Sequence, residues 1–339
     1  MKAWNGNFST PTAQKWLEKV EKDLKGKSID DLSWTWDDTL AFSPAYFVAP
    51  NADFKVLSQS RIWAITEPFT LSSPTQTNHD ILEALNMGAE HIYVTITRDL
   101  SEAEWAALFN KVIFSYIQVT LNFSVNVAAL ASLDSFLQKS DWSPSQLFII
   151  ADQTAEIPAN LILCRRVATE IHIRTDDSAM QLAKQMRQSE QILQKSKQPE
   201  HLYFNVHLNK SFYHNIAWIQ ALKILWQNIL DAYQLDPNTP IHLTAHIQDN
   251  DKLDENTQKI NATIQAISAV VCGIHSLLIH PQPGPQKDFE RRINRNIQHL
   301  LKLESYMDQV LNPTEGAYYF EHLTKELAEH AWAHFKKLD

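Results

Sequence analysis

Eight short apolar segments alternate with helical runs between residues 61 and 310, and this alternation limits the chain to very few folds. Parallel strands need a crossover of a dozen or more residues, so repeated strand–helix units indicate a parallel sheet. Eight such units form a closed (β/α)8 barrel, the α/β fold that we predict. The strand candidates are residues 62–66, 91–97, 116–122, 147–151, 170–174, 202–208, 241–247 and 276–280. The clearest helical runs are residues 74–87, 179–195, 214–233 and 256–271, whereas residues 156–167 are ambiguous.

The alternative is an open doubly wound sheet, and glycine usage argues against it. That fold places a glycine-rich turn after its first strand, where the backbone approaches a phosphate. The chain has only 6 glycines in 339 residues, and it contains neither GxGxxG nor GxxxxGK[ST]. A nucleotide-binding sheet is therefore disfavoured.

Residues 1–60 differ in character from the barrel segment. Residues 14–25 form an amphipathic helical run with Trp16, Val20 and Leu24 on one side. An irregular segment follows, and its rings must bury against the chain's own domain or against a partner. We predict three parts: an N-terminal arm (1–60) that makes a subunit contact, the barrel (61–310), and a C-terminal turn and helix (311–339). The aromatic residues of the arm are Trp34, Trp36, Phe42, Tyr46 and Phe47.

Charge and cysteine content restrict the partners and the compartment. The formal net charge is −9 and no basic cluster is interleaved with aromatic residues, which argues against nucleic acid as a partner. The longest stretch without charged residues, 112–133, contains Gln118, Asn122 and Asn126, so we interpret it as a buried strand and helix rather than a membrane span. Because Cys164 and Cys272 form no CxxC pair and the start lacks an apolar signal region, we predict a cytoplasmic protein.

Histidines occur on four successive strand candidates. They are His172, His207, His242 with His246, and His280. Histidines that converge at one end of a barrel hold zinc in metal-dependent barrel hydrolases, which gives one alternative function. Strand residues alternate between faces, however, and the first strand lacks the H-x-H that the hydrolase pattern requires. We therefore predict no metal site, and we note that only His246 of its pair lies near the carboxyl end of a strand.

Other candidate catalytic residues have simpler structural explanations. Asp152, Asp176 and Asp177 follow strand candidates, so they could act as acids or bases, but aspartate in this position more often caps a helix. No GxSxG motif occurs. The two cysteines are expected to pack as small apolar side chains, and Trp218 and Trp226 to lie in the core or an interface.

The C-terminal segment contains the most specific sequence motifs of the chain. Residues 287–302 and 317–338 are predicted helices, with Asn312-Pro313 and Gly316 in the turn between them. In the first helix we expect Phe289, Ile293, Ile297, Leu300 and Leu301 to face the core and Arg291, Arg292, Arg295 and Lys302 to face outward. The patterns RxxRNxQxxLxxES and NPxxGAYYxExLTxELAxxAW resemble the end of the barrel domain in the methylmalonyl-CoA mutase family. Residues 21–34, 43–47, 209–226, 241–250 and 273–281 also resemble that family.

The resemblance implies a barrel that holds a CoA ester and an adenosylcobalamin on a second domain that carries a DxHxxG motif. Much of that machinery is missing here. No DxHxxG occurs, residues 63–70 continue directly into a helix without an arginine-rich insert, and IRTDDSAM (173–180) replaces the segment with the catalytic histidine. Gln220 and Thr244 replace two basic residues. Only His246 and Gln248 stand where substrate-contacting residues are expected, and we interpret them as vestigial.

These departures imply the small, non-catalytic subunit of a heterodimeric mutase. This chain would then carry no catalytic residue and bind no cofactor, and the catalytic large subunit would carry adenosylcobalamin. Bulky residues on the strands predict a barrel with a filled axis; they are Trp63, Tyr93, Phe148, Tyr203 and Phe204. The alternatives are the free-standing metal-dependent hydrolase above and a homodimeric relative that binds acyl-CoA.

Overall fold

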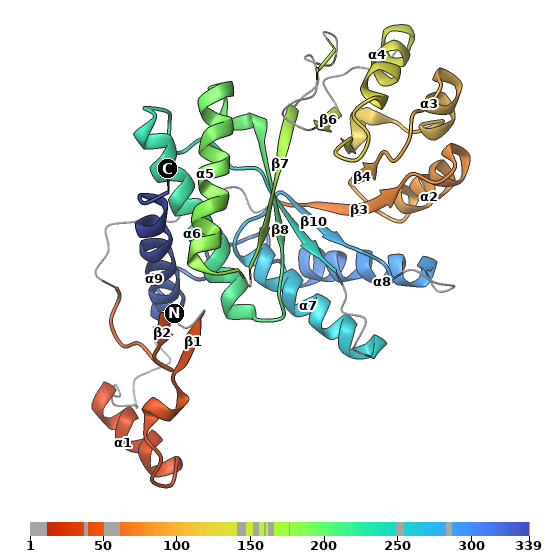
Figure 1. Ribbon diagram of the computed structural model, residues 1–339. Helices are drawn as coiled ribbons and strands as arrows, with labels where there is room; N and C mark the ends of the chain where they lie inside the picture. Colours follow the sequence, from red (N-terminus) through yellow and green to blue (C-terminus); the bar gives the residue numbers. More distant parts are fainter. Residues whose placement is uncertain are drawn as a thin grey trace, which may run out of the picture.

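The computed structural model describes residues 12–36, 40–50, 62–140, 147–151, 156–158, 161, 166–175, 177–248, 254–282 and 287–338. Eight parallel strands close into a barrel, and a separate two-stranded antiparallel hairpin precedes them in the chain (Figure 1). The predicted (β/α)8 fold is therefore confirmed. Around the barrel the strands are β3 (Ala64–Thr70), β4 (His91–Thr95), β5 (Gln118–Asn122), β6 (Leu147–Ile150), β7 (Arg166–Arg174), β8 (Leu202–His207), β9 (Leu243–Ile247) and β10 (Ser276–Ile279).

Helices cover the outside of the barrel. They are α2 (Pro74–Asn86), α3 (Glu102–Leu108), α4 (Ala129–Lys139), α5 (Ala179–Ser196), α6 (Phe212–Ala232), α7 (Glu255–Val271), α8 (Lys287–His299) and α9 (Tyr318–Phe335). Most begin with a side chain that accepts from a free backbone N–H, such as Ser73 before α2 and Ser178 before α5. The residue before α5 that caps it is thus Ser178, and the prediction that Asp177 would cap a helix is wrong. Asp177 instead accepts a hydrogen bond from Gln185.

Alternate strand residues point into the barrel, and they fill it in layers. At the end where the strands begin, His91 bonds to Thr66, Thr120 and Ser276. The next layer is an apolar cluster of five buried side chains: Tyr93, Ile150, Ala168, Tyr203 and Leu278. Tyr203 is fully buried and accepts a hydrogen bond from Thr244 at 2.7 Å. The axis of the barrel is therefore occupied by side chains at this level.

Outward-facing strand residues pack against the helices in two separate apolar clusters. One joins β7 to β10 with α5, α6, α7, α9 and the N-terminal hairpin, and it contains Trp218 and Trp226. The other joins β3 to β6 with α2, α3 and α4. Phe204, for example, points outward and meets the Trp226 ring at 5.4 Å between centroids. The prediction that both tryptophans lie in the core is confirmed.

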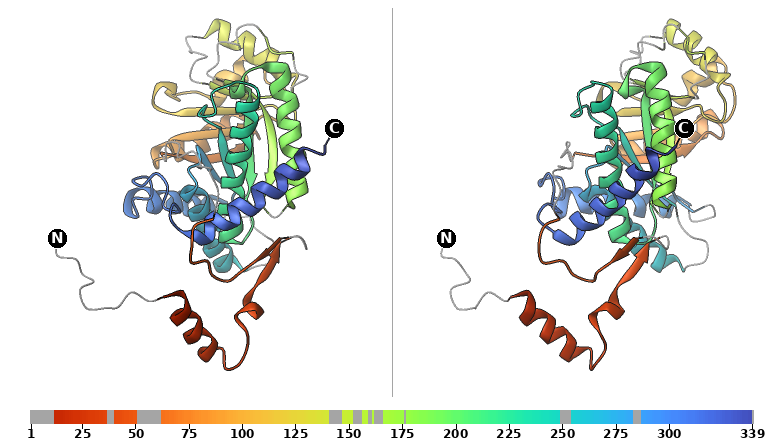
Figure 2. Two further views of the ribbon diagram at one scale, coloured as in Figure 1. Left: turned by 90° about the vertical axis from the view of Figure 1, so that its left-hand side faces the viewer. Right: turned by 60° about the vertical axis from the view of Figure 1, so that its left-hand side comes forward.

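The N-terminal arm consists of a part that packs on the barrel domain and a part that does not. The hairpin strands β1 (Trp34–Trp36) and β2 (Leu40–Phe42) bury Trp36 and Phe42, and Trp36 stacks on His214. Helix α1 (Ala13–Asp23) has no buried residue, and it lies at the end of the arm away from the barrel in every view (Figure 2). The arm's aromatic residues therefore cover its own domain more than the sequence suggested.

The prediction for α8 is right for Ile297 and Leu301, which are buried, and wrong for two of its arginines. Arg291 and Arg295 are buried and both bond to Glu67, which points outward from β3. Phe289 and Leu300 are 42% and 48% exposed. The helix ends in a π-helical turn, Leu300–Glu304, and the chain then reaches Gly316, whose φ of +80° fits the predicted glycine turn.

Candidate functional site

The carboxyl ends of the strands meet at one mouth of the barrel, where a polar network surrounds Glu170. Its side chain is 7% exposed. Five side chains donate to its carboxylate: Tyr93 (2.8 Å), Asn122 (3.1 Å), Ser124 (3.0 Å), His172 (3.2 Å) and Asn205. These donors come from β4, the end of β5, β7 and β8. The closed barrel therefore brings them to a single carboxylate.

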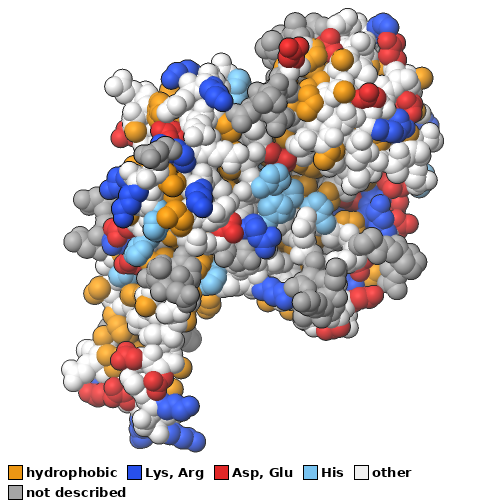
Figure 3. Space-filling view, viewed as in Figure 1, with side chains coloured by type: hydrophobic (Ala, Val, Ile, Leu, Met, Phe, Trp, Pro, Cys, Tyr) orange, Lys and Arg blue, Asp and Glu red, His pale blue; other side chains and the backbone are white. Residues whose placement is uncertain are grey.

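Two pairs of histidines extend from this carboxylate. Nδ1 of His172 lies 3.0 Å from Nε2 of His207. Nδ1 of His246 lies 3.1 Å from Nε2 of His280, and Nε2 of His246 lies 2.9 Å from Oδ1 of Asn205. Figure 3 shows histidine side chains gathered near the middle of this face of the molecule. The structure thus brings together four of the five histidines that the sequence singled out.

The fifth histidine lies at the opposite end of the barrel. His242 precedes β9; its ring stacks on His275 at 4.6 Å between centroids and packs at a tilt against Tyr203 at 4.5 Å. His242 and His246 both point inward, as their even spacing predicts. Three residues of the chain lie between them, however, and they sit at opposite ends of β9, so they cannot share a ligand.

The two residues proposed as vestigial substrate contacts occupy different environments. His246 is 6% exposed, and both of its ring nitrogens lie within hydrogen-bond distance of protein partners. Gln248 follows β9 and is exposed. His246 therefore has no ring nitrogen left for a substrate in this arrangement. That the pair once contacted substrate stays a prediction.

Zinc sites are built from three or four protein ligands. Within the described ranges there is no group of three or more His, Cys, Asp or Glu side chains that could hold a metal ion. In each pair the two nearest ring nitrogens lie 3.0–3.1 Å apart, within hydrogen-bond distance of one another. The geometry supports hydrogen bonding between neutral imidazoles instead.

Burial controls the protonation of this network. Burial lowers the pKa of His280 to about 4, and burial together with the nearby His172 and Arg174 lowers the pKa of His207 to about 4. Burial also lowers the pKa of His246 strongly. His172 differs, because its hydrogen bond to Glu170 raises its pKa. Although burial alone would raise the pKa of Glu170, its hydrogen bonds to His172, Tyr93 and Ser124 lower the pKa overall.

These shifts predict that the folded protein loses stability in mild acid. Burial lowers the pKa of His91 to about 3. This histidine therefore binds protons more weakly in the folded than in the unfolded chain, as His207 and His280 do. The free energy of unfolding should therefore be at its full value above about pH 6.5. As the pH drops toward 4, it should fall by up to about 1.4 kcal/mol per pH unit for each of these histidines. His172 acts in the opposite direction, but its side chain is 57% exposed. Urea midpoints measured at pH 7 and pH 5 test this, and an unchanged or higher midpoint at pH 5 contradicts it.

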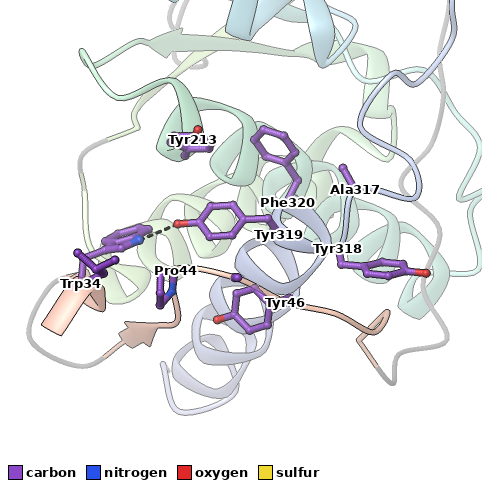
Figure 4. Close-up of a pocket in the computed structure, with 10 residues that line it drawn as sticks. Trp34, Pro44, Tyr46, Tyr213, Ala317, Tyr318, Tyr319 and Phe320 are labelled. Carbon is purple, nitrogen blue, oxygen red and sulfur yellow. Dashed lines mark hydrogen bonds between the residues drawn. The ribbon is translucent and has the colours of Figure 1, made fainter. Parts of the chain in front are cut away.

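A second candidate site is an aromatic pocket beside the arm. A pocket of about 700 Å³ opens between the hairpin segment, the start of α6 and the start of α9 (Figure 4). Trp34 donates a hydrogen bond to the Tyr319 hydroxyl at 2.7 Å, and Tyr46 stacks on His322. Its other lining residues include Pro44, Tyr213, Tyr318 and Phe320. The pocket is lined mainly by aromatic rings with hydroxyl groups, a composition common in protein interfaces.

Sequence analysis did not identify the centre of the mouth network. No motif in the sequence marks the carboxylate of Glu170 or the amides of Asn122 and Asn205, which lie in predicted strands. A usable signal was present: Glu170 and His172 are two residues apart, as are Asn205 and His207, so each pair shares one strand face. Asp152, Asp176 and Cys164 lie outside the described residues, and Cys272 is buried and packs beneath α6, as predicted.

Adenosylcobalamin is the cofactor that the resemblance implies for the family. Cobalamin-binding relatives would need an imidazole with a free nitrogen. His172 is the most exposed imidazole of the network, yet one of its nitrogens faces Glu170 and the other faces His207. His172 therefore has no ring nitrogen left for a cofactor ligand bond in this arrangement.

Fold and site together define a closed α/β barrel that has a filled axis and a hydrogen-bonded mouth. Residues 178–339 match the methylmalonyl-CoA mutase family model. The chain is 21% identical over 98% of its length to a methylmalonyl-CoA mutase small subunit of Porphyromonas gingivalis, of which it spans 63%. It is 31% identical over 37% of its length to a probable small subunit of Mycobacterium bovis and 26% identical over 41% to a methylmalonyl-CoA mutase of Escherichia coli, spanning 22% and 20% of those proteins.

The chain is therefore similar to methylmalonyl-CoA mutases, through the family model in residues 178–339 and through the Porphyromonas gingivalis small subunit over 98% of its length. No helix in the described part of the chain is long and apolar enough to cross a membrane.

Proposed function

We propose that this chain is the small, non-catalytic subunit of a heterodimeric adenosylcobalamin-dependent methylmalonyl-CoA mutase, which interconverts methylmalonyl-CoA and succinyl-CoA. The observation that carries the proposal is the filled barrel axis. In the family the catalytic barrel holds the CoA ester, whereas here Tyr93, Tyr203 and Leu278 occupy the axis and are 3% exposed or less. A chain with this interior supports a catalytic partner without binding the substrate itself.

The mouth of the barrel supports the same proposal. His246 stands where the family contacts substrate, but Asn205 and His280 occupy both of its ring nitrogens. No DxHxxG motif is present in the 339 residues. The large subunit then carries the cofactor and all of the catalytic groups.

The arm provides the contact with the large subunit. No residue of helix α1 is buried. Trp16 is 40% exposed, although its ring meets the Phe47 ring edge-on at 5.3 Å between centroids. Phe47 and Val48, farther along the arm, are 42% and 69% exposed. Burying a large apolar side chain contributes roughly 1.5–3 kcal/mol before ordering costs. This exposed strip is therefore the part of the arm that a partner would cover.

Co-expression with the large subunit tests the proposal. The intact chain should co-purify with the large subunit, and a chain lacking residues 1–33 should lose it, because α1 is removed while the hairpin stays on its own domain. In the full-length chain, Trp16→Ser with Val20→Ser should weaken the complex at least tenfold. The matched control, Glu18→Ser with Glu21→Ser, changes the same helix on exposed positions and should not.

Activity assays complete the test. Alone, the chain should retain no adenosylcobalamin after desalting and should not isomerise methylmalonyl-CoA. Turnover by the isolated chain would refute its non-catalytic role. Failure of the intact chain to bind the large subunit would refute the subunit assignment, and a homodimer in place of the complex would favour a free-standing relative.

A further inference from the structure

The two histidine pairs at the barrel mouth end on different chemical groups. We call Glu170, His172 and His207 the carboxylate arm, and Asn205, His246 and His280 the amide arm. Both contain two imidazoles whose nearest nitrogens are 3.0–3.1 Å apart. Only the carboxylate arm ends on a group that can hold a charge next to a protonated imidazole.

Hydrogen-bond donors and acceptors in the carboxylate arm can be assigned from Glu170 outward. An ionised carboxylate only accepts, so Nε2 of His172 carries the proton in its 3.2 Å contact with Glu170. When His172 is neutral, its Nδ1 is an acceptor and Nε2 of His207 must donate to it. Nδ1 of neutral His207 then carries a lone pair. The arm therefore runs from a buried carboxylate to an acceptor nitrogen at the outer end.

We propose that Glu170, His172 and His207 form a proton relay that makes the barrel mouth an acid–base site for small activated acyl esters. A water molecule attacks the ester carbonyl, the bond to the leaving alkoxide or phenoxide breaks, and the water proton goes to Nδ1 of His207. The Nε2 proton of His207 passes at the same time to Nδ1 of His172. The positive charge then rests on His172 beside Glu170, and His207 is neutral again with its proton on Nδ1.

The side chains around Glu170 favour the transferred proton on His172. Glu170 is held in position by Tyr93, Asn122, Ser124 and Asn205, which keeps its charge directed at His172. The other ionisable groups close to the carboxylate arm are Arg174 on β7, His246 on β9 and His280 after β10. All except Arg174 are neutral at pH 7, so Glu170 is the group that decides where the proton stays. His207 is the residue that meets the substrate, and Glu170 and His172 position and recharge it.

The amide arm is an internal control for the proposal. Nδ2 of Asn205 donates to Glu170, so its Oδ1 accepts from Nε2 of His246 and His280 donates to Nδ1 of His246. A carboxamide neither takes up nor releases a proton at neutral pH, so a proton that enters at His280 cannot move on to the carboxylate. The two arms have the same imidazole geometry and should differ in acid–base behaviour.

Two measurements on the full-length chain test the relay. In an NMR titration of the imidazole ring signals, His172 should change protonation above pH 6.5, and His207→Asn should shift that midpoint while His280→Asn leaves it in place. Glu170→Gln should lower the His172 midpoint by at least one pH unit. A His172 midpoint that responds equally to both asparagine variants, or does not respond to loss of the carboxylate, overturns the relay.

Hydrolysis of p-nitrophenyl acetate is the second measurement. General-base catalysis by a positioned side chain contributes about 10²–10⁴-fold, so His207→Asn should lower the rate per chain at least tenfold. His280→Asn and His79→Asn, an exposed histidine away from the mouth, should stay within twofold of the unaltered chain. Equal loss in His207→Asn and His280→Asn would show a general effect of the cluster and overturn the proposal. The proposal is independent of mutase assembly, because both measurements use the isolated chain.

Discussion

Replacing Glu67 with alanine is expected to lower the free energy of unfolding by about 3–5 kcal/mol. Glu67 is 4% exposed, and it pairs with Arg291 and Arg295, which are 5% and 6% exposed. The bonds from Nε of Arg291 and Nη1 of Arg295 are both 2.5 Å long. Removing the carboxylate leaves two buried guanidinium groups without their anion. Arg291 retains Asp80, whose carboxylate lies 3.4 Å away, so part of the loss is recovered there.

Urea unfolding at pH 7 measures this effect. Glu329→Gln is the matched control, because Glu329 pairs with Lys325 on the surface and should change stability by less than about 1 kcal/mol. The triple variant Glu67→Met, Arg291→Met, Arg295→Met removes every charge of the group and should be more stable than Glu67→Ala. If the single and triple variants are equally unstable, packing rather than an unpaired charge explains the loss.

Tyr203→Ala should destabilise the chain by about 3–5 kcal/mol and open a cavity in the barrel axis. Tyr203 is fully buried in the layer with Tyr93 and Leu278, and its ring packs on His242. The walls of the cavity would be largely apolar, so it should stay dry and bind benzene or xenon. Added benzene should therefore raise the melting temperature of this variant.

Tyr203→Phe is the control for the cavity. It keeps the ring and loses the hydrogen bond from Thr244, so the expected cost is about 1 kcal/mol with no response to benzene. A Tyr203→Ala chain that is as stable as Tyr203→Phe would show that the axis is not closely packed. That result would also remove the main support for a non-catalytic barrel.

The barrel could be predicted because each strand leaves a local signal. The predicted segments 91–97, 202–208 and 276–280 match β4, β8 and β10 to within two residues at each end. Short apolar runs bounded by helical periodicity determine strand positions with little help from distant contacts. The hairpin of β1 and β2 gave no such signal. Its strands are three residues long and are stabilised by packing of Trp36 on His214, far along the chain.

The buried face of α8 could not be predicted from its own residues. A periodic pattern places arginine outward unless the facing surface supplies an anion. That anion is Glu67, 224 residues before Arg291. Only the closed barrel brings the two together, and the same applies to Glu170 and its donors from four strands. Sequence patterns therefore located most of the histidines of the site but not the carboxylate that organises them.

The division of the outward-facing core into two apolar clusters has a consequence for how the molecule opens. Residues of β3 to β6 and their helices form one cooperative unit, and residues of β7 to β10 with α9 and the hairpin form another. Contacts between the two sets run through the backbone ladders at the β6–β7 and β10–β3 seams, which have three and two paired positions, and through the inward-facing side chains of the barrel. Amide hydrogens on the two sides should then exchange with solvent as two groups, with separate opening free energies. We therefore expect the two halves of the closed barrel to open separately.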